Sequence, residues 1–116
     1  MDRADTPEER MSLLVEQVAN HRSAGGEVAL ASERGRVVYG DRLLRLDLTD
    51  DERDRLDDLL GRFHVFKVKE PETRKASDGV VYVSAKADPK HAADFIEGVF
   101  RLVFGEPEGY ELRVEA

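Results

Sequence analysis

The sequence predicts a single α+β domain in which helices pack on one antiparallel sheet. Three segments begin with residues that cap helices, and short β-rich runs bounded by turn residues lie between and after them. The chain has 116 residues, a length typical of one domain, and 41% of them are apolar, which is enough to build a core. We therefore expect one domain over residues 1–116, with a disordered tail at residues 1–5.

The first helix is predicted to begin at Thr6 and to end before Gly25-Gly26. Thr6 supplies a hydroxyl N-cap, Pro7 suits the first helical position, and Glu9 can close a capping box. The apolar residues that follow are spaced by three and four positions, which places them on one side of the helix. These residues are Met11, Leu14, Val15 and Val18.

Three β-rich runs separate this helix from the next one. In the last of them leucines alternate with Arg45 and Asp47, so the leucines face the core and the charged residues face solvent. The expected elements, in order, are a strand at residues 27–32, a turn at 33–36, a strand at 37–39, a turn at Gly40-Asp41 and a strand at 43–48.

The second helix is predicted from Thr49, where Glu52 completes a second capping box. Its apolar residues again share one side: Leu56, Leu59, Leu60 and Phe63. Carboxylates cover the other side from Asp50 to Asp58. They suit either a solvated acidic helix surface or a divalent-cation site, and the first interpretation is the simpler one.

The third helix is predicted from the N-cap Asp88 to Phe104, before Gly105 ends it. Its apolar residues cover more than one stripe, which predicts burial on two sides or an exposed interface. Strands are expected at residues 65–69, 80–86 and 110–114, and an exposed loop at 70–79.

From residue 43 to residue 114 the order is strand, helix, strand, strand, helix, strand. This order resembles the ferredoxin-like arrangement, in which two helices cover one face of an antiparallel sheet. The preceding helix and hairpin either cover the open face, extend the sheet or change its topology. A profilin-like or roadblock-like sandwich is the alternative, although a strand after the last helix fits it less well.

Composition excludes several classes of protein. The absence of cysteine removes disulfide scaffolds, cysteine-ligated metal centres and thiol nucleophiles. No run approaches the roughly 18 apolar residues that span a bilayer, and the charged N-terminus is unlike a signal peptide. We therefore expect a cytoplasmic protein that does not insert into membranes, with no cofactor and no bound metal.

The net charge of −7 is unevenly distributed. Residues 64–91 contain six Lys and Arg against four Asp and Glu, a local charge of +2, so the other residues carry −9. On paired strands the basic residues could share a face with one tyrosine and with Arg45, as on sheets that bind single-stranded nucleic acid. A solvated strand face is the alternative interpretation. The candidate residues for nucleic acid or another anion are Lys67, Lys69, Arg74, Lys75, Tyr82 and Lys86.

The leading functional expectation is a non-enzymatic interaction or regulatory module that self-associates, most simply as a homodimer. It depends on the excess apolar surface of the last helix, where Phe100, Val103 and Phe104 are the candidate interface residues. Nucleic-acid binding is the second hypothesis.

A small acid/base enzyme around His91 and Asp94, with Glu97 one turn further, is the third hypothesis. Phosphate-loop, nucleophile-elbow and metalloprotease motifs are absent from the sequence.

Overall fold

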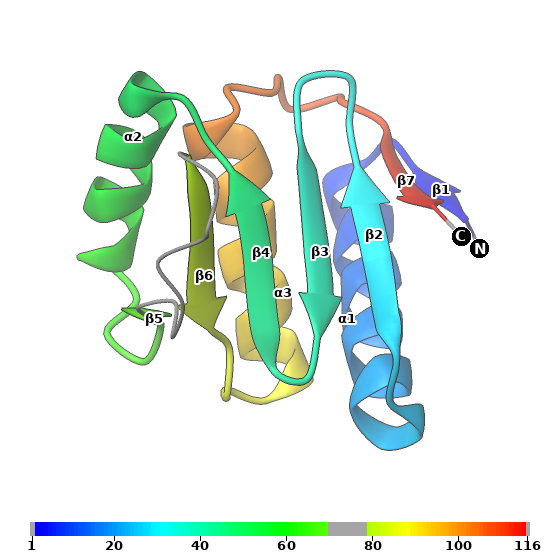
Figure 1. The fold of residues 1–116 in the computed structure, drawn as a ribbon. Helices are drawn as coiled ribbons and strands as arrows, with labels where there is room; N and C mark the ends of the chain where they lie inside the picture. Colours follow the sequence, from blue (N-terminus) through cyan, green and yellow to red (C-terminus); the bar gives the residue numbers. More distant parts are fainter. Residues whose placement is uncertain (1, 70–78, 116) are drawn as a thin grey trace.

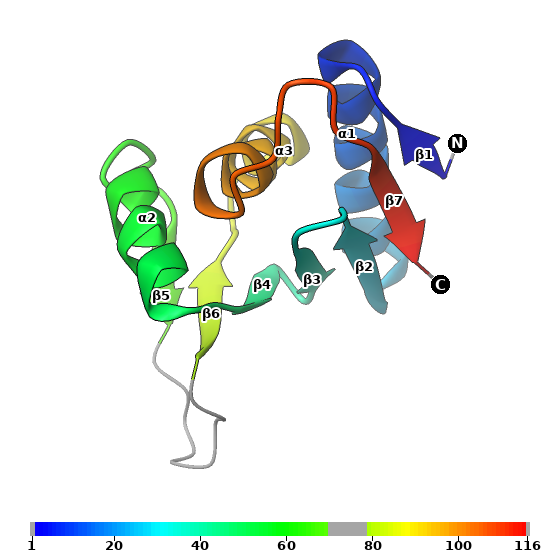
Figure 2. The same cartoon turned by 90° about the horizontal axis from the view of Figure 1, so that it is seen from above.

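A seven-stranded antiparallel sheet with three helices on one side forms the part of the chain that the computed structural model describes, residues 2–69 and 79–115 (Figure 1). The helices are α1 (Pro7–Ala24), α2 (Asp50–Leu60) and α3 (Pro89–Gly98), and α3 continues as a π-helical turn (Val99–Val103). The strands are β1 (Arg3–Ala4), β2 (Glu27–Ala31), β3 (Arg36–Gly40), β4 (Leu43–Asp47), β5 (Lys67–Lys69), β6 (Val80–Ser84) and β7 (Leu112–Glu115). Seen from above, all three helices lie on the same side of the sheet (Figure 2).

The predicted helix caps are present. The hydroxyl of Thr6 accepts a hydrogen bond from the backbone N–H of Glu9, and Asp88 accepts one from the N–H of His91. Thr49 and Glu52 form a complete capping box. Each cap satisfies an amide that the first helical turn leaves without a partner, which explains why the helices begin where the sequence predicted.

The strand order β1-β7-β2-β3-β4-β6-β5 differs from the ferredoxin-like order. The elements from residue 43 onward follow one another as predicted, and β6 lies between β4 and β5 as that fold requires. The last strand, β7, pairs with β2 and not with β4. A two-residue turn joins β3 to β4, so the β2–β3 hairpin occupies the edge of β4 that β7 would take. The predicted α+β class and the βαββαβ succession of elements are present, and the ferredoxin-like order of neighbouring strands is not confirmed.

The N-terminal segment extends both layers of the fold. Helix α1 packs beside α3 on the same side of the sheet. The prediction of a disordered tail at residues 1–5 is wrong for Arg3 and Ala4, which pair with β7 and place Ala4 in the core. The predicted loop at residues 70–79 lies outside the described residues, except for Gly79.

The core fills the space between the helices and the sheet. Phe66 and Phe95 stack with ring centroids 4.3 Å apart, and Phe63 meets both rings edge to face. Phe100, Val103 and Phe104 are also buried, at 0%, 0% and 6% exposure. The expectation that these three residues form an interface is therefore wrong: the π-helical turn directs them inward and leaves Leu102 outside.

Gly35 is required by this packing, because a Cβ at that position would overlap the ring of Phe104. We predict that Gly35→Ala lowers the free energy of unfolding by about 2 kcal/mol through overpacking. Urea unfolding measures the change. Gly109→Ala is the matched control, since a Cβ there meets nothing within 4 Å. Equal stability of the two variants would contradict the prediction.

Candidate nucleic-acid interface

The strands alternate between a side that faces the helices and a side that we call the open face. Residues such as Leu30, Val37, Leu44 and Val83 belong to the core, so their neighbours in each strand point away from the helices. The charged residues of the open face are Arg3, Arg36, Arg45, Lys67, Lys69 and Arg113, with Glu27, Asp47 and Glu115. Six cations therefore face three carboxylates on this surface, although the whole chain carries −7.

One row across the sheet combines an aromatic residue with two basic residues. Arg45 in β4 lies opposite Tyr82 in β6, and Tyr82 lies opposite Lys69 in β5. Directly opposed residues have Cβ atoms about 5 Å apart, so the tyrosine ring has a cation on either side. Lys67, opposite Ser84, adds a fourth residue in the next row. Arg45, Lys67 and Lys69 are exposed, and Tyr82 is half-buried.

The structure brings together four of the predicted residues and adds others. Lys67, Lys69 and Tyr82 share the open face, and Lys86 is exposed just beyond the end of β6. Arg74 and Lys75 lie outside the described residues. The prediction omitted Arg3, Arg36 and Arg113, which join the surface through the pairing of β7 with β1 and β2.

The alternation of core and solvent-facing residues along a strand could have predicted Arg36 and Arg113 on this surface, since both lie next to core residues in the chain. Arg36 forms an ion pair with Glu115 at 3.1 Å, so part of its charge is neutralised. The half of the open face that contains Tyr82 is therefore the more available to a ligand.

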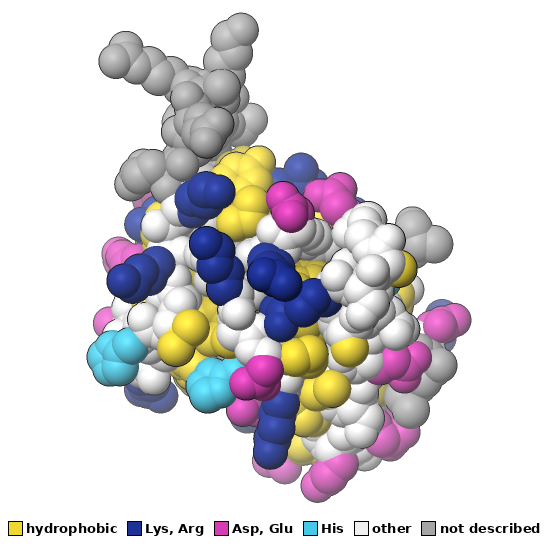
Figure 3. Space-filling model, turned by 90° about the horizontal axis from the view of Figure 1, so that it is seen from below, with side chains coloured by type: hydrophobic (Ala, Val, Ile, Leu, Met, Phe, Trp, Pro, Cys, Tyr) yellow, Lys and Arg dark blue, Asp and Glu magenta, His cyan; other side chains and the backbone are white. Residues whose placement is uncertain are grey.

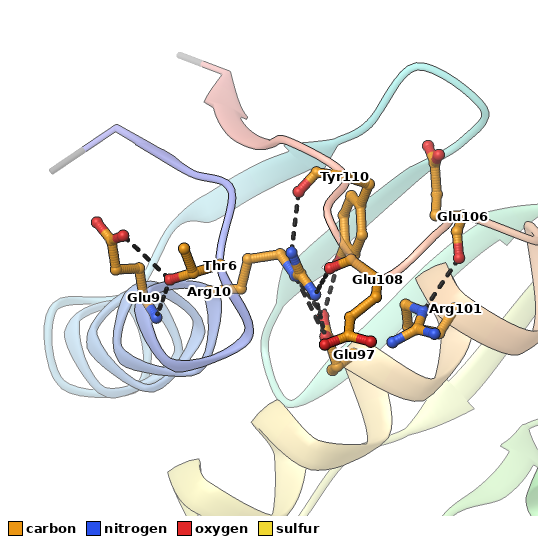
Figure 4. Close-up of polar contacts among 8 residues, drawn as sticks. All are labelled: Thr6, Glu9, Arg10, Glu97, Arg101, Glu106, Glu108 and Tyr110. Carbon is orange, nitrogen blue, oxygen red and sulfur yellow. Dashed lines mark hydrogen bonds and ion pairs between the residues drawn. The ribbon is translucent and has the colours of Figure 1, made fainter.

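A second polar cluster is buried between α1, α3 and the segment before β7 (Figure 4). The guanidinium group of Arg10 is fully buried and donates to both carboxylate oxygens of Glu97, at 2.9 to 3.2 Å. It also donates to the backbone oxygens of Glu108 (2.7 Å) and Tyr110 (2.9 Å). Its carbon lies 4.0 Å from the centre of the Tyr110 ring, and the Tyr110 hydroxyl donates to Glu97 at 2.7 Å.

This cluster stabilises the fold and is not a binding or catalytic site. Its donors and acceptors are directed at one another, and within the described residues no buried side-chain nitrogen or oxygen lacks a partner. Burial, followed by the hydrogen bond and charge of Glu97, raises the pKa of Tyr110 far above its ordinary value of 10. A phenol held protonated in this way is unsuited to proton transfer near neutral pH.

The acid/base hypothesis gains no support from His91. Its side chain is 56% exposed, and its nearest carboxylate partner is the helix cap Asp88, at 4.0 Å. The backbone N–H of His91 donates to Asp88, which lowers the pKa of that carboxyl group. Glu97 is engaged by Arg10 and Tyr110. Across residues 2–69 and 79–115, no group of three or more acidic or histidine side chains could hold a metal ion.

Arg10 is predicted to be a major source of stability. In Arg10→Met, Glu97 would lose its counter-charge and two backbone oxygens would lose their donor, so we expect a loss of about 3 kcal/mol in the free energy of unfolding. The control is Arg53→Met, which removes an exposed ion pair with Asp57 and should cost at most about 0.5 kcal/mol. Comparable losses in urea unfolding of the two variants would refute the assignment.

The raised pKa of Tyr110 predicts a specific loss of stability in alkali. The folded state keeps this phenol protonated where the unfolded chain releases the proton, so the stabilisation is complete below about pH 10 and declines as the pH rises further. Above that pH the wild-type protein should lose about 1.4 kcal/mol per pH unit more than Tyr110→Phe. Unfolding curves at a series of alkaline pH values test this, and parallel slopes would contradict it.

Comparison with known proteins adds a family but no activity. No helix in the described part of the chain is both long and apolar enough to cross a bilayer. Comparison with curated proteins and with solved structures finds no match. The model of one family matches residues 1–116, and its description is a family of unknown function, DUF7975. Because that match spans the whole sequence, the chain belongs to the DUF7975 family.

Proposed function

We propose that the protein binds single-stranded nucleic acid on the open face of its sheet. The row formed by Arg45, Tyr82 and Lys69 is the observation that carries this proposal. An aromatic ring between two cations offers a base a surface to stack on, and offers the phosphates on either side a positive charge. No catalytic chemistry is required of these residues.

A single strand suits this surface better than a duplex does. The Tyr82 ring can stack only with a base whose face is accessible, and the bases of a duplex are already stacked on one another. The side chains along the middle of the open face are small or of moderate size: Ala29, Ala31, Val38 and Leu43. Because Val38 and the two alanines are buried, a strand lying across β6, β4 and β3 would contact mainly the side chains of Arg45 and Tyr82.

Charge separation supports the same proposal. The exposed carboxylates of α2 belong to the helical layer, behind the sheet, whereas the six open-face cations lie on the other side. A polyanion approaching this acidic protein would be repelled by the helices and attracted to the open face. The electrostatic field of the protein would therefore orient the polyanion toward the open face. The small number of cations limits the affinity and makes it sensitive to salt.

Self-association, the leading expectation from the sequence, becomes the weaker candidate. It depended on Phe100, Val103 and Phe104, which are buried within the chain. Among the described residues, only Val65 (57%) and Leu102 (47%) are large apolar side chains with high exposure. Obligate dimers bury extensive apolar surface, and two separate residues do not provide it.

Binding of a mixed-sequence single-stranded oligonucleotide tests the proposed function. If three phosphates are neutralised, affinity should fall roughly 20-fold between about 50 and 200 mM salt. Tyr82→Ala should weaken binding about 30-fold without changing the salt dependence, because stacking does not release counterions. Lys69→Glu should weaken binding and also reduce the salt dependence. Fluorescence anisotropy at several salt concentrations measures both quantities.

The matched control is Arg53→Glu, which changes the net charge as Lys69→Glu does but lies on α2 in the helical layer. Equal effects of the two charge reversals would show that only the total charge matters and would overturn the proposed site. Light scattering of the same samples reports whether the protein is a monomer or a dimer.

A further inference from the structure

A cleft of about 440 Å³ opens at the end of the sheet where β3 turns into β4. It is lined by His21 and Arg22 at the end of α1, by Gly25-Gly26, and by Asp41 and Arg42 of the turn. Figure 3 shows this end of the molecule, where Lys and Arg side chains gather. The volume is within the range of sites that hold small ligands.

One buried residue, Ala85, hydrogen-bonds to the backbone of Arg42 and to the side chain of Arg22. The backbone N–H of Ala85 donates to the carbonyl oxygen of Arg42 at 2.8 Å, and its own carbonyl oxygen accepts from Nη2 of Arg22 at 3.0 Å. The Nε of Arg22 also donates to the Tyr39 hydroxyl at 3.3 Å. Within the described residues, Nη1 of Arg22 makes no hydrogen bond. Lys86 follows Ala85 in the chain and is exposed.

Arg42 has a backbone conformation that an arginine does not favour. Asp41 and Arg42 both have positive φ values, 50° and 58°, in a two-residue hairpin turn. Such turns favour Asn or Asp followed by Gly, because glycine adopts positive φ without strain. The first residue follows this preference and the second does not. An arginine at a position where glycine would be more stable is consistent with a function for its side chain.

The cleft also contains carboxylates. Glu27 and Asp41 line it, and the stem of Glu27 lies so close over Gly40 that a Cβ there would be 2.6 Å from its Cγ. A site for a bare anion would exclude these groups. A nucleotide suits the combination, because arginine binds its phosphate and carboxylates accept hydrogen bonds from its hydroxyl groups.

We propose that this cleft binds the terminal nucleotide of a nucleic-acid strand, with Arg22 and Arg42 on a terminal phosphate monoester. The proposal depends on the proposed function for its ligand, since Glu27 and Gly40 belong to the row of the open face next to Tyr82. A strand that crosses the open face would reach the cleft at its end. The terminal phosphate carries more charge than an internal one and can be gripped by the planar forks of both arginines.

The test compares oligonucleotides of one sequence, about ten nucleotides long, that carry a hydroxyl at both ends, a 5′-phosphate or a 3′-phosphate. One of the phosphorylated forms should bind at least about tenfold more tightly than the hydroxyl form. Arg42→Gly should abolish this preference while leaving the midpoint of thermal unfolding unchanged or higher, because glycine suits the turn. No preference in the wild-type protein, or an unchanged preference in Arg42→Gly, would overturn the proposal.

Tyr82→Ala separates this inference from the proposed function. It should weaken binding of all three oligonucleotides by the same factor and leave the preference for the phosphate intact. If no oligonucleotide binds, the proposed function fails. Binding of AMP to the protein is then the test of whether the cleft is a nucleotide site. Binding of AMP that is lost in Arg42→Gly would then uphold a nucleotide site, and absence of AMP binding would refute it.

Discussion

The fold depends most on the buried guanidinium group of Arg10. It joins α1 to α3 through Glu97 and holds the segment before β7 through two backbone oxygens. A buried charge is stable only where hydrogen-bond acceptors and an opposite charge surround it. The position of each of these three elements therefore constrains the other two. The same bonds set where β7 enters the sheet, and thereby which residues complete the open face.

Local signals in the sequence were sufficient to predict the helices and strands, but they were insufficient to predict which strands lie next to one another in the sheet. Capping residues at Thr6, Thr49 and Asp88 marked the helix starts correctly, because a cap is a contact within one turn. The position of β7 depends on which strand has a free edge once the rest of the sheet is assembled, and no local pattern contains that information. The burial of Arg10 was not predicted for a related reason. A charged residue on a helix is expected to face solvent, and the partners that allow Arg10 to be buried are 87 to 100 positions away in the sequence.

The candidate site was predictable to the extent that it depends on strand alternation. Lys67, Lys69 and Tyr82 could be placed on one face because β5 and β6 form a hairpin, although the pairing of Tyr82 with Arg45 needed the sheet order. The apolar excess of the last helix was recognised but misassigned. Its second buried side packs within the same chain, because α1 and the segment after the π-helical turn cover it.

The pairing of β1 with β7 has a consequence for how the sheet forms. Strand β1 has β7 as its partner, and the N–H of Val114 donates to the carbonyl oxygen of Asp2 at 2.9 Å. Because β7 is synthesised after β1 and β2, both of those strands lack their shared partner until β7 has been made. Until β7 pairs with it, β2 has an unpaired edge that is open to any other strand or chaperone nearby.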